Sequence, residues 1–386
     1  MSFLSKIAQI YPASGIRRMF DLAANYEDVV SLCLGEPNFV TPTHIKNAAK
    51  EALDQGLTHY TPNAGLTELR EAVAAKYLRE YGLQYSVDNV MITAGAMEAL
   101  YLSMLTTLDP GEEIIVPDPC FPAYLGQIAL LGIKAVRVPL LECNRFKVRA
   151  EDVEKAITPK TKAILLNSPN NPVGSILGKE DLEALAEVAL RHNLLVFSDD
   201  VYEKIVYDDQ PYHCIAQMPG MQERTIVINS FSKTYAMTGW RVGYLLASEE
   251  LVGRMPRMQE GIVACLPAFV QKAAAAALEG SDEPILEMVE SYTKKRSILI
   301  DGLLEIPGLT CQKPEGTFYA FPNIKAYGKS SLEFAEELLE QAGVVTVPGS
   351  AFGELGEGYL RLSFAGSDDS LREATRRIGA HIKKCY

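Results

Sequence analysis

The sequence predicts an α/β protein with a mostly parallel central sheet, helices on both faces of that sheet, and a smaller α+β domain. Between about residues 90 and 250, short apolar runs alternate with amphipathic segments of helical length, which is typical of a parallel sheet. Most of these runs lack the polar and apolar alternation that a sheet with one face in water requires, so both faces are expected to be covered. After Gly280 the pattern changes, and the remaining residues predict the smaller domain.

The expected elements follow in chain order. Seven buried strands are predicted at residues 90–94, 114–117, 135–140, 163–167, 194–198, 225–229 and 242–247, with helices at 97–108 and 179–191 between them. The last part of the chain is expected to contain a long charged helix at 284–304, a strand at 316–322, a helix at 332–342, strands at 344–347 and 359–364, and a closing helix from Ser370.

The chain is expected to divide into three parts. Residues 1–40 show no sheet pattern and are predicted to form an N-terminal arm and part of the small domain. Residues 41–282 are predicted to form the large domain, and residues 283–386 the C-terminal small domain. The polar segment at 281–284, which ends in proline, marks the expected junction.

Composition and charge exclude several classes of function. The 386 residues include 37 Lys and Arg against 49 Asp and Glu, a net charge of −12, so the surface repels phosphate backbones and no nucleic acid partner is expected. No apolar run approaches the roughly 18 residues that cross a bilayer, and no secretion signal is evident. The seven cysteines form no CxxC pair and the five histidines no HxxxH pair, so no metal site is predicted. We therefore expect a soluble, cytoplasmic protein that binds neither nucleic acid nor membrane.

The segment from Ser230 to Arg241 follows an apolar strand and carries the clearest indication of chemistry. Near other cations and shielded from water, Lys233 could lose its proton and form a Schiff base. Ser230, Ser232 and Arg241 would supply hydrogen-bond donors and positive charge for a phosphate dianion. The alternative is a surface loop with an ordinary solvated lysine.

Three further segments leave predicted strands at the same edge of the sheet, where α/β folds bind ligands. The amides of Gly95, Ala96 and Met97 would face an anion at a helix N-terminus, unless the segment is only a tight turn. The carboxylate of Asp199 would hold a heterocyclic nitrogen protonated, or it caps the next helix. The proline-rich loop around Asn171 offers three side-chain amides, or it is an ordinary turn.

Together these segments resemble fold-type I pyridoxal-phosphate enzymes, and among them the class I aminotransferases closest to bacterial aspartate and aromatic aminotransferases. The resemblance covers nearly the whole chain, with the motifs GEPNF at 35–39, YTPNAG at 60–65, NNP at 170–172, SDDVY at 198–202, SFSK at 230–233, GWRVG at 239–243 and YLRLS at 359–363. It implies pyridoxal 5'-phosphate as the cofactor, bound by the large domain.

The resemblance implies a role for each residue around the cofactor ring. Lys233 would bind the cofactor covalently and then carry the proton between the substrate α-carbon and the cofactor. Asp199 would pair with the pyridinium nitrogen and so preserve the ring as an electron sink. Asn171 and Tyr202 would hydrogen-bond the ring oxygen. Phe121 would stack on the ring face, unless it is an ordinary core aromatic.

The same resemblance implies how the phosphate is held. Ser230, Ser232, Arg241 and the backbone of residues 95–97 would bind it. Tyr60 would reach the phosphate of the neighbouring protomer, so a homodimer with shared active sites is implied.

The resemblance also assigns the substrate contacts. Arg361 would bind the α-carboxylate as a bidentate fork, assisted by Gly35 and Asn171, unless it is an ordinary arginine at a strand edge. Close aspartate-specific relatives usually carry a lysine where this chain has Met97. Ile16 and Met97 would instead form an apolar side-chain pocket, or they only pack. Strict aspartate specificity is therefore not expected, and aromatic or long-chain donors, including an acylated diaminopimelate, are favoured.

The resulting prediction is a dimeric aminotransferase that exchanges an amino group between an amino acid and a 2-oxo acid, with 2-oxoglutarate as the expected acceptor, by a ping-pong mechanism. A carbon–sulfur β-lyase of the cystathionine type is an alternative, because it shares the same carbanion chemistry. A third hypothesis is a regulator that senses pyridoxal phosphate. No basic helical module precedes residue 40, and the acidic charge also counts against this hypothesis.

Overall fold

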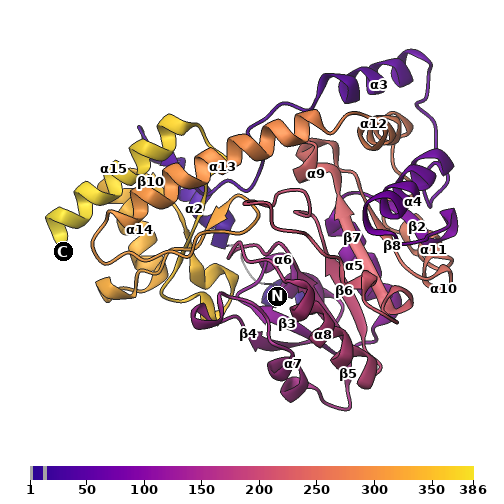
Figure 1. Cartoon of the computed structure of the whole chain (residues 1–386), viewed down its shortest axis with the longest axis horizontal. Coiled ribbons are helices and arrows are strands. Elements are labelled where there is room, and N and C mark those ends of the chain that lie inside the picture. Colours follow the sequence, from indigo (N-terminus) through magenta and orange to yellow (C-terminus); the bar gives the residue numbers. More distant parts are fainter. Residues whose placement is uncertain (1–2, 12–14) are drawn as a thin grey trace.

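The computed structural model describes residues 3–11 and 15–386. Its largest feature is a seven-stranded sheet in the order β2-β8-β7-β6-β5-β3-β4, in which β8 runs antiparallel to both of its neighbours and the other pairs are parallel (Figure 1). The strands are β2 (Val90–Thr93), β3 (Glu113–Asp118), β4 (Lys134–Pro139), β5 (Thr161–Asn167), β6 (Leu195–Asp199), β7 (Thr225–Ser230) and β8 (Gly243–Leu246). The predicted mostly parallel central sheet is confirmed.

Both faces of this sheet are buried, which explains the continuous apolar runs. Ile114 and Val116 of β3 pack in the cluster that contains residues of α5 and α6, whereas Ile115 between them packs in the cluster that contains residues of α8. Since successive side chains of a strand point to opposite faces, helices must cover both sides. The helices around the sheet are α3 (Thr43–Asp54), α4 (Thr67–Tyr81), α5 (Ala96–Thr107), α6 (Pro122–Leu130), α7 (Ala150–Ala156), α8 (Lys179–Arg191), α9 (Phe231–Thr234), α10 (Glu249–Val252), α11 (Met255–Glu260) and α12 (Ala268–Glu279).

A second, smaller part of the molecule contains an antiparallel sheet of three short strands in the order β11-β12-β9. Its elements are α13 (Glu283–Leu304), β9 (Tyr319–Ala320), α14 (Ser331–Ala342), β10 (Val344–Val345), β11 (Val347–Pro348), β12 (Leu360–Ser363) and α15 (Asp368–Cys385). Figure 1 shows α13, in orange, running from the side of the large sheet to the side where α14 and α15 lie. The expected α+β character of this part is confirmed.

The N-terminal residues depart from the sequence prediction. Helices α1 (Lys6–Ile10) and α2 (Gly15–Ala23) are followed by a strand, β1 (Val30–Ser31), which pairs in parallel with β10. The expectation that the first 40 residues contain no sheet was therefore wrong. A strand of two residues is too short to show a period of two, and its partner lies more than 300 residues further along the chain.

Two strand predictions in the last part were also wrong in detail. The expected strand at 344–347 is two strands, because β10 pairs with β1 and β11 pairs with β12. The expected strand at 316–322 forms ladder pairs only at β9. In both cases the partner strand decides the boundary, and the local sequence does not contain that information.

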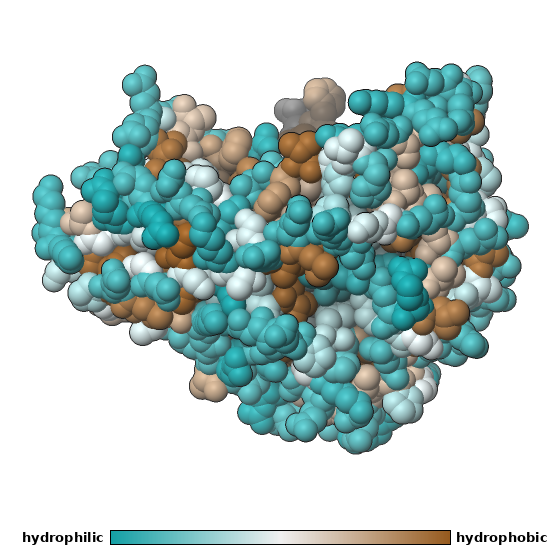
Figure 2. Space-filling model, turned by 45° about the horizontal axis from the view of Figure 1, so that its top comes forward, coloured by the Kyte–Doolittle hydropathy of each residue, from teal (hydrophilic) through white to brown (hydrophobic). Residues whose placement is uncertain are grey.

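The surface of the molecule is polar over the face drawn in Figure 2, where hydrophobic residues form small separate groups. None of the described helices combines the length and the apolar character that spanning a bilayer demands. Some large apolar side chains are exposed. Four of them lie at residue 60 and on or after helix α11: Tyr60, Met258, Ile262 and Val263.

Candidate active site

A cavity of about 300 Å³ lies where β5, β6 and β7 end and helix α5 begins. Parallel neighbours end at the same edge of a sheet, and the register places Asn167 of β5 beside Asp199 of β6. Arg361 enters the cavity from β12 of the smaller part. The residues predicted from sequence that line this cavity are Ile16, Gly35, Ala96, Met97, Phe121, Asn171, Asp199, Tyr202, Ser230, Ser232, Lys233, Arg241 and Arg361.

Lys233 lies on the single turn of α9, directly after β7, and is partly buried. Its Nζ donates a hydrogen bond of 2.5 Å to the carbonyl oxygen of Gly35. Removal from water, together with the charges of Arg361 and Arg241, lowers the pKa of the Lys233 amine to about 8, although the carboxylates of Glu36 and Asp199 act in the opposite direction. A larger fraction of this amine is therefore neutral at physiological pH than for a solvated lysine, as a nucleophile or base requires.

Asp199 ends β6 and is 4% exposed. The hydroxyl of Tyr124 donates to its Oδ2 at 2.5 Å, and the backbone N–H of Val201 is 3.4 Å from its Oδ1. Burial raises the pKa of Asp199 to about 6, although the Tyr124 hydrogen bond acts in the opposite direction. The carboxyl group is therefore predominantly ionised at neutral pH, and it presents a buried negative charge to the cavity.

Arg361 is a buried cation without a carboxylate partner among the described residues. It is 1% exposed, and its guanidinium carbon lies 4.4 Å from the ring centre of Tyr319 and 4.9 Å from that of Phe352. It donates to Asn171 Oδ1 at 3.2 Å and to the carbonyl oxygen of Cys33 at 2.8 Å, while its buried Nε has no partner. An unneutralised charge in the interior is costly, so this guanidinium is suited to bind an anionic group.

The start of α5 forms a second anion-binding element. Helix geometry leaves the first amide groups of α5, which begins at Ala96, without partners inside the helix. The guanidinium of Arg241 lies beside them and donates to the carbonyl oxygens of Ala94 at 3.3 Å and Thr238 at 3.0 Å. Gly95 has a φ of +80°, and a Cβ there would lie 2.7 Å from Arg241 Nη2. Only glycine therefore allows the arginine to reach this turn.

The two serines of the Lys233 segment complete this element. Ser230 and Thr93 both pair with Gly243 of β8, which brings the ends of β7 and β2 together. Ser230 Oγ accepts from the N–H of Ser232 at 3.1 Å and donates to Ser232 Oγ at 2.8 Å. Hydroxyl groups, free helix amides and a guanidinium then surround one space, which suits a dianion.

Tyr202 is buried, and its hydroxyl lies 3.1 Å from the hydroxyl of Tyr319. Burial raises the pKa of Tyr202 well above its ordinary value, so the hydroxyl stays protonated and can donate. The position of Asn171 is fixed by a hydrogen bond, which its backbone N–H donates to the side-chain oxygen of Asn167 at 2.9 Å.

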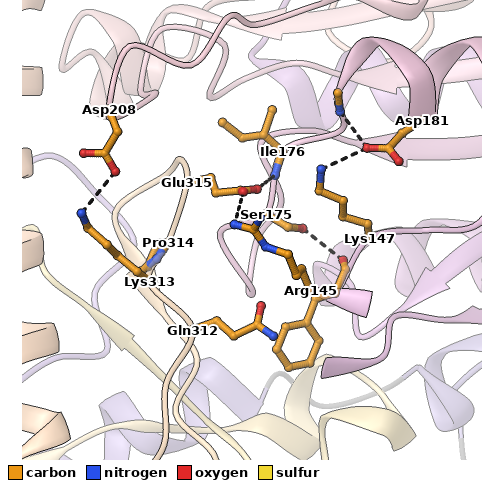
Figure 3. A network of polar contacts seen from close by, with 12 residues as sticks. Arg145, Lys147, Ser175, Ile176, Asp181, Asp208, Gln312, Lys313, Pro314 and Glu315 are labelled. Atoms are coloured by element: carbon orange, nitrogen blue, oxygen red, sulfur yellow. Dashed lines mark hydrogen bonds and ion pairs between the residues drawn. The ribbon is translucent and has the colours of Figure 1, made fainter. Parts of the chain in front are cut away.

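A polar network fixes the loop after β5 to the segment before β9 (Figure 3). The carboxylate of Glu315 accepts from the backbone N–H of Ile176 at 3.0 Å and forms an ion pair with Arg145. Lys313 pairs with Asp208 at 3.2 Å on the other side of the same segment. These contacts hold together two loops that lead to cavity residues, Asn171 and Tyr319.

Sequence reasoning missed several residues that line the cavity: Leu100, Tyr124, Asn167, Val201, Thr238 and Tyr319. Asn167 ends a predicted strand at the same edge, so the rule that found Asp199 would also have found it. The two tyrosines, by contrast, have no local signal, since their roles depend on how α6 and β9 pack. Gly95 directly precedes the lining residue Ala96.

Tyr60 does not line the cavity, and 91% of its surface is exposed. Its role in the site of a neighbouring protomer stays a prediction.

One group of metal-ligating residue types does come together, away from the cavity. Glu337, His381 and Cys385 offer ligand atoms within 4.8 Å of one another. However, Glu337 contacts Nε2 of the His381 ring at 2.9 Å, whereas Cys385 approaches Nδ1 at 3.8 Å. Because the two contacts use opposite nitrogens of the His381 ring, a hydrogen bond between this ring and Glu337 accounts for the arrangement.

Comparisons with known proteins agree with this geometry. Residues 27–378 match the family model of class I and II aminotransferases. The chain is 46% identical to aromatic-amino-acid aminotransferase 2 of Thermococcus litoralis, over 100% of this chain and 99% of that protein. It is also 46% identical to the aspartate aminotransferase of Pyrococcus abyssi, over 95% and 94% of the two chains. The crystal structure of Pyrococcus protein-A1 superposes with a TM-score of 0.96 at 44% identity and 98% coverage of each chain. The chain therefore belongs to the class I and II aminotransferases, a family of enzymes that depend on pyridoxal phosphate.

Proposed function

We propose that this aminotransferase binds pyridoxal 5'-phosphate in the cavity, with the ring nitrogen at Asp199 and the phosphate at the start of α5. The donor set supports this placement. A buried, ionised carboxylate suits a protonated ring nitrogen. Asn171 accepts from Arg361 through its Oδ1, so its amide hydrogens can serve the ring oxygen together with the Tyr202 hydroxyl. Phe121 is half-buried and lies at the same cavity, where it can cover a ring face.

The chemistry divides between the cofactor and the chain. The cofactor, when bound, withdraws electrons from the substrate carbon that loses its proton. Lys233 would hold the cofactor through its Nζ, and its free amine would carry the proton that leaves and returns to the substrate α-carbon. Arg361 binds the α-carboxylate through two parallel N–H groups and orients the α-hydrogen toward the lysine. The rings of Tyr319 and Phe352 flank Arg361 and would exclude water from the guanidinium and the bound carboxylate.

The single observation that carries the proposal is that Lys233 and Arg361 line the same cavity. The lysine has a lowered pKa, and the arginine is a buried cation with no carboxylate partner among the described residues. An uncompensated buried charge destabilises a protein, so a guanidinium of this kind favours a role in binding an anionic group.

We infer that the amino donor has an aromatic or otherwise apolar side chain. Among the described residues that line the cavity, the cations are Lys233, Arg241 and Arg361, and each already has a role. These described residues leave no cation for a second carboxylate, whereas Ile16 and Met97 supply apolar surface. The names of the relatives include both aromatic and aspartate aminotransferases and leave the choice open. The acceptor that we would test first is 2-oxoglutarate.

We also propose a homodimer with shared active sites. Tyr60 lies near a group of exposed apolar residues on and after α11, because the neighbouring Asn63 accepts a hydrogen bond from Gln259 at 2.9 Å. Met258 and Ile262 are exposed in that group. An apolar surface beside a tyrosine that projects from the chain fits a second copy of this chain.

The test is a panel of amino donors with 2-oxoglutarate as acceptor, with the visible absorption of the cofactor recorded in parallel. We expect turnover that requires the acceptor, and higher kcat/KM for phenylalanine than for aspartate. Ammonia and an oxo acid released without any acceptor would instead show lyase chemistry. A preference for aspartate would overturn the assignment of the donor class but not that of the cofactor site.

A further inference from the structure

We propose that Tyr124 is a positioning residue, which holds the carboxylate of Asp199 in the orientation and charge state that the cofactor ring nitrogen needs. The inference rests on the proposed function, and it concerns a residue that does not itself contact the substrate.

The geometry around Asp199 gives Tyr124 this role. Its hydroxyl donates to Asp199 Oδ2 at 2.5 Å, a distance typical of a strong hydrogen bond from a hydroxyl to a carboxylate. The other donor to this carboxylate is the N–H of Val201, at the longer distance of 3.4 Å. Asn167 contacts the same residue but donates to its backbone oxygen, at 2.9 Å. Tyr124 is therefore the main side-chain anchor of the carboxylate.

Tyr124 is built to act only as a donor. It is 1% exposed, and burial raises the pKa of its hydroxyl well above the ordinary value. The hydroxyl is therefore protonated at neutral pH and can donate its proton to the carboxylate. The ring is fixed against Phe121, with ring centres 5.6 Å apart at an interplanar angle of 84°. Phe121 itself lies at the cavity. One short segment at the start of α6 therefore supplies both the aromatic side chain proposed to cover the cofactor ring and the hydroxyl that holds Asp199.

Few other charges stabilise the ionised carboxylate. Lys233 favours it, but less than the two hydrogen bonds do, and Tyr202 nearby carries no charge at neutral pH. Burial acts against ionisation and has already raised the pKa of Asp199 to about 6. Loss of the Tyr124 hydroxyl raises this pKa further, toward neutrality, because a charge-stabilising hydrogen bond disappears. A protonated Asp199 is a poor partner for a protonated ring nitrogen.

The test combines Tyr124→Phe with a cofactor analogue. The dissociation constants of pyridoxal 5'-phosphate and of its 1-deaza analogue, in which carbon replaces the ring nitrogen, are measured by equilibrium dialysis of the full-length protein. We expect Tyr124→Phe to weaken binding of pyridoxal 5'-phosphate by about 10-fold or more, as loss of a hydrogen bond to a charged group implies. Binding of the deaza analogue should change little, since it has no nitrogen for Asp199 to hold.

Tyr292→Phe is the matched control. Tyr292 is also fully buried, and its hydroxyl has no hydrogen-bond partner among the described residues. This variant should bind both compounds as the unmodified protein does, and thermal unfolding of both variants without cofactor shows whether either one misfolds.

The outcomes separate the two proposals. Equal losses for both compounds would mean that Tyr124 only packs, and an unchanged affinity for pyridoxal 5'-phosphate would also overturn the inference. A protein that binds neither compound before any substitution would instead refute the proposed cofactor site. In the double variant Tyr124→Phe/Asp199→Asn, the tyrosine should have no additional effect, because its partner has lost the charge.

Discussion

The cavity has two walls of different character. The buried wall consists of Asn171, Asp199, Tyr202 and Arg361, all at most 5% exposed and held by hydrogen bonds or packed rings. The outer wall is the more exposed side, with Ile16, Met97 and Phe121, and its residues contribute mainly apolar surface. From this difference we expect substitutions in the buried wall to affect the reaction itself, and substitutions of the side chains of Ile16 and Met97 to affect mainly the choice of donor.

The largest expected effect is on the lysine between the two walls. Lys233→Ala should lower kcat by about 10⁴-fold or more, because it removes both the nucleophile and the proton carrier. The absorption band of the bound cofactor should also shift to that of the free aldehyde, because no imine to the chain can form. Lys295→Ala is the control, since burial also lowers the pKa of Lys295 but this lysine lies outside the cavity. Undiminished turnover in Lys233→Ala would refute the role of this residue.

The second effect concerns the buried wall. Arg361→Lys should reduce kcat/KM for α-amino acids by roughly 10- to 100-fold, since a lysine cannot form the two parallel hydrogen bonds to a carboxylate. Steady-state kinetics with phenylalanine provide the measurement. Transfer from phenethylamine, which lacks the carboxylate, should be equally slow in both proteins. A parallel loss with that amine would show that Arg361 supports the fold of the site rather than the substrate.

A smaller effect is expected at the outer wall. Met97→Lys should raise kcat/KM for aspartate relative to phenylalanine by about 10-fold, because it introduces a cation where the cavity lacks a free one. The change should appear in the ratio of donors, with the cofactor absorption unaltered. Met97→Leu keeps the apolar character and should leave the ratio as it was. If Met97→Lys instead abolished cofactor binding, the two walls would not be separable.

The smallest effect is a shift in pH dependence. Formation of the cofactor complex by the cofactor-free protein should slow about tenfold per pH unit below pH 8, because only the neutral Lys233 amine can attack. In Arg361→Gln the midpoint should move to higher pH, since Arg361 is one of the charges that lower this pKa. Stopped-flow absorption across pH 6 to about 10 measures both midpoints. A midpoint that did not move would show that the charge of Arg361 does not contribute to the pKa of Lys233.

The sequence predicted the large sheet well for a physical reason. Its strands are buried on both faces, so each appears as a continuous apolar run, and side chains directly after such runs must meet at one edge. Asp199 and Lys233 could be found in this way. β1 and Tyr124 could not be found, because the first depends on pairing with a distant strand and the second on the packing of α6 against the end of β6. Local pattern carries no information about either contact.

The hydrogen bond and the ion pair of Glu315 connect two segments that lie far apart in the sequence (Figure 3). They join the 174–176 loop to the segment before β9 through the buried carboxylate of Glu315, so these two segments should move together when a donor binds. Donors of different size are then expected to be accommodated at other parts of the lining, such as the partly buried side chain of Ile16.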